Sequence, residues 1–543
     1  MARGRLDEGS RSCDPRRLMS AERLASPGTA AAEPHLDLDD VRRCTELLEA
    51  MARDRALLAE VPLEMRQALL IAAGQVSRPQ SYQEKHLVKA LRRGKRRREE
   101  ADDRKARAAT GIRVARGAPV FTAPLLAGPA ETPEPTPRQL KKPKSCYVCK
   151  VEFTRLHHFY DALCPACAEL NYAKRFQAAS LAGRVSLVTG ARVKIGFQTA
   201  LKMLRAGARV IVTTRFPHDA ALRYAREPDF AEWKDRLHVH GLDLRHSPSV
   251  EIFARYVEHS AGRLDILVNN ACQTVRRPPE FYAHLLENES RRASDLKAEA
   301  GAVLASHEGL KAALTGSRSL PVATGAEATG LLAWHGGRGG VGITESAGLS
   351  QVRYAYDDAA QRSDLFPTGR VDADLQQVDL RHRNTWRLAL AEVHTAEMLE
   401  VLLVNAVAPF VLNARLKPLM MRERTGEKHI VNVSAMEGIF SRGTKTDKHP
   451  HTNMAKAALN MMTLTAARDY ASHGIHMNAV DTGWVTDEDP AVHADRKRQE
   501  LDFEPPLDIV DGAARVCDPF FSGLLTGVHV SGKFLKDYKP SDW

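Results

Sequence analysis

Four of the eight cysteines stand in two close pairs within the stretch CYVCKVEFTRLHHFYDALCPAC. Each pair can point two thiolates at one ion from a tight turn, and four thiolates complete a closed tetrahedral zinc site. A redox dithiol, which needs only one pair, and an iron–sulfur centre are the alternatives. The spacing predicts structural Zn²⁺ in a small knuckle over residues 146–175, bound by Cys146, Cys149, Cys164 and Cys167.

A second stretch with chemical potential is HPHTNMAKAALN, residues 449–460. It contains His449 and His451, which titrate near neutrality, followed by Thr452 one helical turn before Lys456. The aliphatic hydroxyl of Thr452 titrates too high to act as a comparable base. The stretch is either a proton-transfer site or an unreactive polar loop with surface histidines.

From residue 181 onward, strands alternate with helices in the sequence pattern. These elements must position the side chains of residues 449–460. The segment RVSLVTGARVKIGFQTALKMLRAGARVIVTTR is a strand, a glycine turn, a helix and a second strand, a unit that places a pyrophosphate at a helix N-terminus. The segments LHVHGLDL, RLDILVNNACQ, KHIVNVSAMEG and GIHMNAVDTGWV continue the rhythm. The sequence predicts an α/β fold, a Rossmann-like doubly wound parallel sheet over residues 181–543.

The landmarks of this segment resemble the short-chain dehydrogenase/reductase (SDR) family. The glycine turn has Lys194 in place of the family's middle glycine, and Thr452 stands where the family has its active-site tyrosine. The turn after the sixth strand also differs, with Thr486 one place early. The residues that match are Thr189, Gly190 and Gly196 of the glycine turn, Asn269 and Ala271 of an Asn-Asn-Ala motif, and the active-site residues Asn405, Ser434 and Lys456.

The resemblance implies hydride transfer between a nicotinamide cofactor and a carbonyl or alcohol substrate. Ser434 would hold the substrate oxygen and Lys456 the nicotinamide ribose. Without the tyrosine, the proton must come from another group, and His451 is the nearest that titrates in the right range. The implied cofactor contacts are Thr189, Gly190, Arg192, Lys194, Ile195, Gly196, Arg215, Asp243, Asn269, Ala271, Lys456 and Thr486.

The end of the second strand predicts which cofactor binds. An acid there favours the free ribose of NAD, whereas a base accommodates the additional phosphate of NADP. The strand ends in Arg215, and Arg192 and Lys194 add positive charge, so NADP(H) is predicted, with NAD as the alternative. Against this, the Cβ atom of Lys194 would crowd the approach of the pyrophosphate.

An insertion of about a hundred residues, at about 281–380, separates Asn269 from Asn405. It leaves the carboxyl edge of the sheet, where ligands bind in open α/β folds. Its Ala- and Gly-rich composition favours a lid or a partner-binding loop over a second catalytic domain.

The front of the chain is basic, with 33 Lys and Arg against 23 Asp and Glu in residues 1–180, which carries most of the net charge of +11. We expect a disordered N-terminus (1–35), a helical basic region (36–117) and a Pro-rich linker (118–145). The arginine run at 92–98 either binds nucleic-acid phosphates or forms a solvated helix face paired with the acids at 99–103. Because no aromatic residue interrupts the run, the solvated face is favoured, and a nucleic-acid or protein partner is the alternative.

The longest apolar run, VLLVNAVAPFVLNA (401–414), is interrupted by Asn405 and Pro409, so a buried helix and no membrane span is expected. The unpaired cysteines and the acidic residues near the N-terminus favour the cytoplasm. The family resemblance also implies a homo-oligomer. The rival to an enzyme is a non-catalytic NAD(P)-binding scaffold or sensor, which the missing tyrosine would favour.

Overall fold

The computed structural model describes residues 37–118, 120–121, 138–316, 340–354 and 363–543. The chain divides into two compact units, Met1–Gly94 and Lys95–Trp543. This division falls within the single helix α3 (Ser81–Ala108) and not in the Pro-rich segment. The predicted disordered segment 1–35 and most of the predicted linker, 122–137, lie outside the described residues.

The first unit contains α1 (Leu38–Arg53), α2 (Leu63–Ser77) and the start of α3. Neither α1 nor α2 buries a residue. Further along α3, Arg96 pairs with Glu100 one turn later, with 2.8 Å between Nε and Oε1. This pairing matches the solvated-face interpretation of the arginine run.

An eight-stranded sheet forms the centre of the second unit, in the order β10-β9-β8-β7-β6-β3-β4-β5. All neighbours are parallel except β9 and β10. The chain runs from β3 through β4 to β5 and then returns to the other side of β3 with β6, so the switch point lies between β3 and β6. The strands are β3 (Val185–Thr189), β4 (Arg209–Thr214), β5 (Leu237–Gly241), β6 (Ile266–Asn269), β7 (Lys428–Ser434), β8 (Ile475–Asp481), β9 (Phe534–Lys536) and β10 (Lys539–Ser541).

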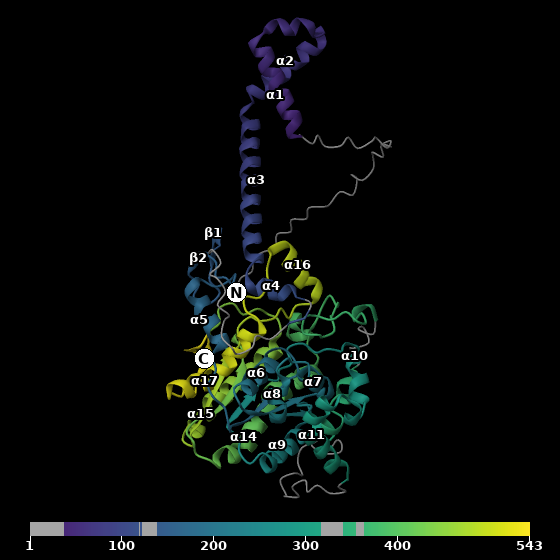
Figure 1. The fold of residues 1–543 in the computed structure, drawn as a ribbon, viewed down its shortest axis with the longest axis vertical. Coiled ribbons are helices and arrows are strands. Elements are labelled where there is room, and N and C mark those ends of the chain that lie inside the picture. Colours follow the sequence, from purple (N-terminus) through teal and green to yellow (C-terminus); the bar gives the residue numbers. More distant parts are fainter. Residues whose placement is uncertain (1–36, 119, 122–137, 317–339, 355–362) are drawn as a thin grey trace, which may run out of the picture. The chain divides into compact units, whose positions relative to one another are not determined.

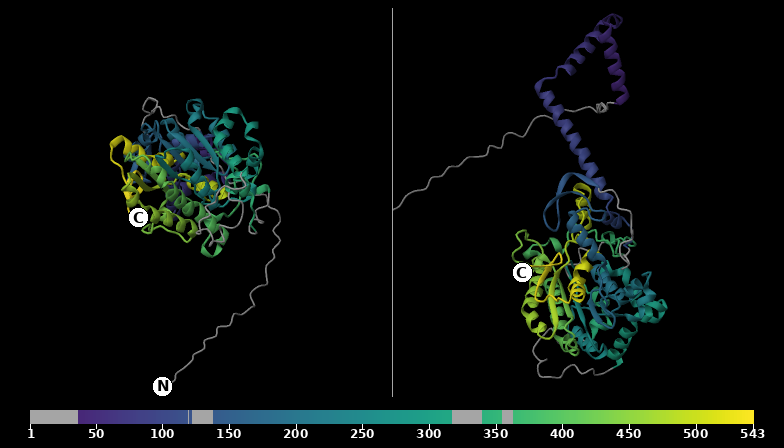
Figure 2. Two further views of the ribbon diagram at one scale, coloured as in Figure 1. Left: turned by 90° about the horizontal axis from the view of Figure 1, so that it is seen from below. Right: turned by 60° about the vertical axis from the view of Figure 1, so that its left-hand side comes forward.

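Helices cover both faces of this sheet (Figure 1). Side chains alternate along each strand, so that Val188 packs with the core of one face and Leu187 with that of the other. One face carries α6 (Lys194–Arg205), α7 (Pro217–Tyr224) and α17 (Ile509–Thr526). The other carries α9 (Ser247–Ser260), α14 (Ala408–Met421) and α15 (Pro450–Ala471). The views in Figure 2 show the strands between these layers.

The cysteine segment folds as a small module with its own core. Antiparallel β1 and β2 precede α5, and Ile112 of α4 is fully buried against them. The same core includes Val485 and Leu507, which belong to the α/β body. The elements are α4 (Gly111–Gly117), β1 (Gln139–Ser145), β2 (Glu152–Arg155) and α5 (Pro165–Phe176).

The described parts of the insertion pack on the outer edge of the sheet. Helix α11 (Ala298–Gly316) lies along β5, where the ring of His307 accepts a hydrogen bond from the amide of Gly241 at 3.3 Å. Short helices follow, among them α12 (Val341–Thr344). The insertion also contains α10 (Pro279–Ser290), and these packed helices show that much of it is an integral layer of the body.

One described helix, Thr395–Met421, is long and apolar enough to cross a membrane by length and composition, and 44% of its most apolar window is buried. The helix predicted for residues 401–414 is present, and it continues through Asn405 and Pro409. It passes from α13 (Thr395–Leu402) through a π-helical turn, Leu403–Val407, into α14. Pro409 falls in the first turn of α14, where a missing N–H costs little.

Candidate active site

The glycine turn between β3 and α6 has the tight path that a phosphate-binding loop requires. Gly190 has φ +67°, and a Cβ atom on it would lie 2.7 Å from the Cα of Ala271. A Cβ atom on Gly196 would lie 2.4 Å from the carbonyl oxygen of Gly190. Lys194 has φ +54°, so its backbone follows the left-handed path usual for glycine despite its side chain.

The loop after β6 is fastened to this turn. The hydroxyl of Thr189 accepts hydrogen bonds from the amides of Asn270 at 3.0 Å and Ala271 at 3.1 Å. The Asn269 side chain instead donates to the amide oxygens of Asn413 and Asn432, both at 2.8 Å. Thr189 and Ala271 therefore shape the switch-point crevice, while Asn269 ties β6 to β7 and α14.

Three of the predicted cofactor contacts already have neighbours within the body. Arg192 forms an ion pair with Asp219 at 2.7 Å, and the Asp243 carboxylate holds Arg245 at 2.6 Å. Ile195 packs toward Gly512 of α17, on which a Cβ atom would come within 2.9 Å of the Ile195 side chain. These three residues have structural tasks that a cofactor would not displace easily.

Arg215, at the carboxyl end of β4, has a different environment. Its guanidinium donates to the hydroxyls of Tyr282 at 2.8 Å and Ser350 at 3.2 Å, both from the insertion. It also lies 4.9 Å from the centre of the Tyr282 ring. Burial is the largest single effect and raises the pKa of Tyr282, but Arg215 together with Arg277 and Arg192 more than offsets it, so the pKa is lowered. The positive charge of Arg215 therefore acts on the neighbouring Tyr282 at the carboxyl end of β4.

Thr486 and Lys194 both lie near Glu488, a residue that no motif in the sequence singled out. Its carboxylate accepts hydrogen bonds from the hydroxyls of Thr486 at 2.8 Å and Thr274 at 3.3 Å. Burial opposes ionisation of Glu488, yet Lys194 and Arg277 hold its pKa below the usual value. The carboxylate of Glu488 therefore already interacts with the positive charge of Lys194.

The three residues that match the family's active site already form hydrogen bonds within the protein. Asn405 is bound to the backbone of Gln273 by two hydrogen bonds, at 2.8 and 3.1 Å. Ser434 donates to the side-chain oxygen of Asn460 at 2.6 Å, and the Lys456 ammonium donates to the Val433 carbonyl at 2.7 Å. The hydroxyl proton of Ser434 is therefore already donated to Asn460 of α15.

The histidines before Lys456 do not form an exposed polar loop, so the expectation of surface histidines is wrong. His451 is 2% exposed, and burial together with His449 lowers its pKa to about 4. His449 has φ +43° and stacks on Trp386, with 3.8 Å between ring centres. Thr452 is 1% exposed, and its hydroxyl makes no hydrogen bond to any described residue.

Sequence reasoning missed Glu397 of α13, whose carboxyl oxygen Oε1 lies 3.9 Å from Nε2 of His451. Burial raises its pKa to about 7, although Thr385 and Arg276 lower it in part. A signal was present, because Glu397 and Glu400 stand at helical spacing in an otherwise apolar helix. Acids on the buried face of a helix are rare and often functional.

The four cysteines come together. Their Sγ atoms all lie within 4.8 Å of one another, with 3.6 Å between Cys149 and Cys164. The amide of Cys164 also donates to the Cys146 sulfur at 3.3 Å. Tetrahedral zinc with Zn–S bonds of about 2.3 Å needs sulfurs roughly 3.8 Å apart, so the set fits such an ion.

The cysteine module also contacts the predicted cofactor loop. Tyr147, between the first two cysteines, accepts a hydrogen bond on its hydroxyl from the amide of Trp484 at 2.9 Å. Gly483, with φ +75°, precedes Trp484 in the loop that carries Thr486. The module thereby fixes the backbone of this loop.

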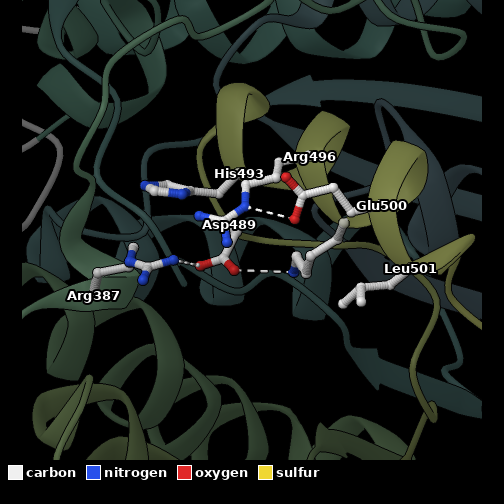
Figure 3. Close-up of a pocket in the computed structure, with 7 residues that line it drawn as sticks. Arg387, Asp489, His493, Arg496, Glu500 and Leu501 are labelled. Carbon is white, nitrogen blue, oxygen red and sulfur yellow. Dashed lines mark hydrogen bonds and ion pairs between the residues drawn. The ribbon is translucent and has the colours of Figure 1, made fainter. Parts of the chain in front are cut away.

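A pocket of about 190 Å³ lies beside α16 (Ala491–Leu501), as Figure 3 shows. Its charged side chains pair with each other: Asp489 binds Arg387 at 3.2 Å and Lys497 at 2.9 Å, and Arg496 binds Glu500 at 3.0 Å. No predicted site residue is among those that line it, which are Arg387, Asp489, His493, Arg496, Lys497, Glu500 and Leu501.

Comparisons with known proteins agree with this architecture. The family model described as short chain dehydrogenase matches residues 184–312, and that described as enoyl-(acyl carrier protein) reductase matches residues 369–504. A relative from Acanthamoeba polyphaga mimivirus, itself uncharacterized, is 30% identical over 390 residues, covering 70% of this chain and 71% of that protein.

Shorter matches are to enzymes. Retinol dehydrogenase 13 of Mus musculus is 37% identical over 103 residues, 19% of this chain and 30% of that enzyme, so the chain spans under a third of its length. A solved dehydrogenase/reductase from Sinorhizobium meliloti is 18% identical with a TM-score of 0.39, covering 68% of this chain and 96% of the other. With both family models placed on the sheet and its helices, the chain belongs to the short-chain dehydrogenase/reductase family.

Proposed function

We propose that the protein is an NADP-dependent oxidoreductase that transfers a hydride to or from a carbonyl or alcohol substrate. The observation that carries the cofactor assignment is Arg215, whose guanidinium donates hydrogen bonds to the hydroxyls of Tyr282 and Ser350. A guanidinium flanked by hydroxyls suits a phosphate, because both kinds of group donate hydrogen bonds to its oxygens. Arg215, Tyr282 and Ser350 would hold the 2′-phosphate.

The rest of the crevice fits a dinucleotide in part. The Gly190–Gly196 turn leaves the N-terminus of α6 open to a pyrophosphate, and Lys456 would hold the nicotinamide ribose. Bound there, the cofactor supplies the hydride. Lys194 is not counted as a phosphate contact, since the carboxylates of Asp374 and Glu488 already lie in its field.

Calorimetry with NADPH and NADH tests this assignment. The wild type should bind NADPH more tightly, and Arg215→Ala should remove most of the difference, on the order of 1–3 kcal/mol for a charge-assisted hydrogen bond. Ser346→Ala is the matched control, because the Ser346 hydroxyl bonds only the Arg215 carbonyl among the described contacts. Equal affinities for the two cofactors would overturn the assignment.

The non-catalytic scaffold is a distinct outcome. NADPH binding without reduction of any member of a panel of aldehydes, ketones and quinones would indicate that role. The engaged Ser434 hydroxyl is the feature that would explain it.

We also propose that the four cysteines bind one structural Zn²⁺. The convergence of four sulfurs supports this, and a reducing compartment such as the cytoplasm would keep them free of disulfides. Elemental analysis should give about one zinc per chain for the wild type and much less for Cys164→Ser, while Cys44→Ser should match the wild type. Iron in place of zinc, or no metal, would contradict the proposal.

A further inference from the structure

Two buried polar side chains, Glu397 and His451, approach each other where α13 packs against the start of α15, and Thr452 is the next residue of α15. Glu397, His451 and Thr452 are each 2% exposed or less. Within the described part of the chain, no well-formed hydrogen bond reaches either ring nitrogen of His451 or the Thr452 hydroxyl. The carboxyl oxygens of Glu397 have no well-formed hydrogen bond either, although Thr385 and Arg276 lie close enough to lower its pKa in part. Buried polar groups are normally hydrogen-bonded, so this cluster is a candidate site for a polar ligand.

The position of this cluster relates it to the reaction. Thr452 occupies the place of the family's proton-transferring tyrosine, one helical turn before Lys456. Glu397 approaches from the opposite helix, with its Oε1 atom 3.9 Å from Nε2 of His451. That separation is too long for a hydrogen bond, so the two side chains are not bonded to each other.

We propose that Glu397 is the proton donor that replaces the absent tyrosine, with Thr452 and His451 orienting the substrate oxygen beside its carboxyl group. The inference rests on the proposed function, because it requires a carbonyl substrate and reduced nicotinamide cofactor. Hydride adds to the carbonyl carbon, the C=O π pair moves to oxygen, and that oxygen takes the Glu397 proton. The product is the alcohol, and the Glu397 carboxylate regains a proton from water before the next turnover.

The electrostatic surroundings make Glu397 a better proton donor at neutral pH than His451. Burial brings the pKa of Glu397 to about 7, so a useful fraction of the carboxyl is protonated at neutral pH. His451, with a pKa of about 4, carries no transferable proton there. The charged or titratable groups that face the pair from neighbouring elements are Arg276, Glu400 and His449.

The decisive experiment is single-turnover NADPH oxidation from pH 5 to 9 with a panel of aldehydes and ketones. The wild-type rate should fall as pH rises through about 7, because the donor loses its proton. Glu397→Gln should lower the rate about a hundredfold or more and leave the NADPH Kd unchanged. Glu397→Asp should recover part of the rate, and the exposed Glu392→Gln is the control expected to match the wild type.

A second readout does not need turnover. Burial also raises the pKa of Glu289 to about 7, so the two proteins must be compared. Infrared pH titration of the cofactor-free wild type should show one more protonated carboxyl group lost near pH 7 than the same titration of Glu397→Gln. A Gln variant as fast as the wild type, or a Glu397 that ionises near pH 4, would overturn the proton-donor assignment alone. A wild type that reduces nothing on the panel would overturn it together with the proposed reaction, whereas failure to bind NADPH would refute the cofactor assignment.

Discussion

Single residues set the character of the crevice, and Lys194 is the clearest case. A lysine in the left-handed region at the start of α6 preserves the path of the glycine turn at a cost of roughly 1–2 kcal/mol in backbone strain. Its charge is balanced by neighbouring carboxylates instead of being left open for a cofactor. Position 194 thus retains the shape of the family's turn while changing its electrostatics.

Replacing Lys194 by glycine and by alanine separates these two effects. Both variants lose the charge, but only glycine relaxes the strained backbone. Lys194→Gly should therefore be more stable than Lys194→Ala by about 1 kcal/mol, against the usual helix preference for alanine. Urea unfolding of the pair measures the difference, and an alanine variant of equal or higher stability would show that residue 194 is not left-handed in solution.

Sequence predicted the residues of the crevice better than it predicted their partners. The rhythm of strand and helix segments and the glycine turn indicated the parallel sheet. The Ser434–Asn460 hydrogen bond and the approach of Glu397 to His451 depend on how helices pack, which no local pattern encodes. The hydroxyl of Tyr282 comes from an insertion whose fold no motif indicated.

At the scale of elements, the cysteine module acts as a support for the loop after β8. Its core shares Val485 and Leu507 with the body, and the Tyr147 hydroxyl receives the Trp484 amide. The module can therefore stabilise the conformation of this loop. The left-handed backbone of Gly483 also contributes to that conformation.

Tyr147→Phe tests this support. The Trp484 amide loses its partner, so we expect a loss of about 1 kcal/mol in the free energy of unfolding and NADPH binding weakened severalfold. Zinc content should not change. Tyr172→Phe, in the same module but engaged through ring contacts, should behave as the wild type in calorimetry and thermal unfolding. Identical NADPH affinity in Tyr147→Phe and the wild type would exclude the supporting role.

Three histidines join β7, β8 and the segment after α17. Nε2 of His429 lies 3.0 Å from Nδ1 of His529, whose ring stacks on His476 with 4.8 Å between centres. Burial and the neighbouring imidazoles lower the pKa of His429 well below its usual value. The unfolded chain therefore binds more protons at this position than the folded one, and stability is lost as pH falls below about 6.5.

His429→Gln should remove that sensitivity. Relative to the wild type, the variant should gain about 1 kcal/mol in stability for each pH unit between 6.5 and the depressed folded pKa. Urea unfolding at pH 7.5, 6.5 and 5.5 measures the difference between the two proteins, which cancels opposing contributions from acids such as Glu397. A pH-independent difference would mean that His429 is not held neutral.

At the scale of the whole molecule, the two units differ in how much hydrophobic core their described residues form. The hydrophobic clusters of the described residues all lie in Lys95–Trp543, whereas α1 and α2 bury nothing and expose Leu63, Leu70 and Ile71. Exposed apolar helix faces of this kind suit a partner, so we retain as a proposal that the basic N-terminal unit binds one. Homo-oligomerisation, implied by the family, is likewise a proposal.

Removal of residues 1–94 should leave the α/β body intact. We expect the chain 95–543 to unfold within about 2 °C of the full-length protein and to bind NADPH equally well, because no described core residue is lost. Differential scanning calorimetry and cofactor titration provide the comparison. A much lower midpoint would show that the first unit stabilises the second.

The insertion also has a consequence for biosynthesis. Strands β6 and β7 pair side by side, yet 428 − 269 = 159 positions separate Asn269 from Lys428. At roughly 5–20 residues per second, a ribosome needs on the order of 10–30 s to deliver β7 after β6. Throughout that interval β6 can pair with β3 on one side and presents a bare edge on the other, the kind of template on which chains aggregate. We therefore expect the long insertion to increase the nascent chain's dependence on chaperones.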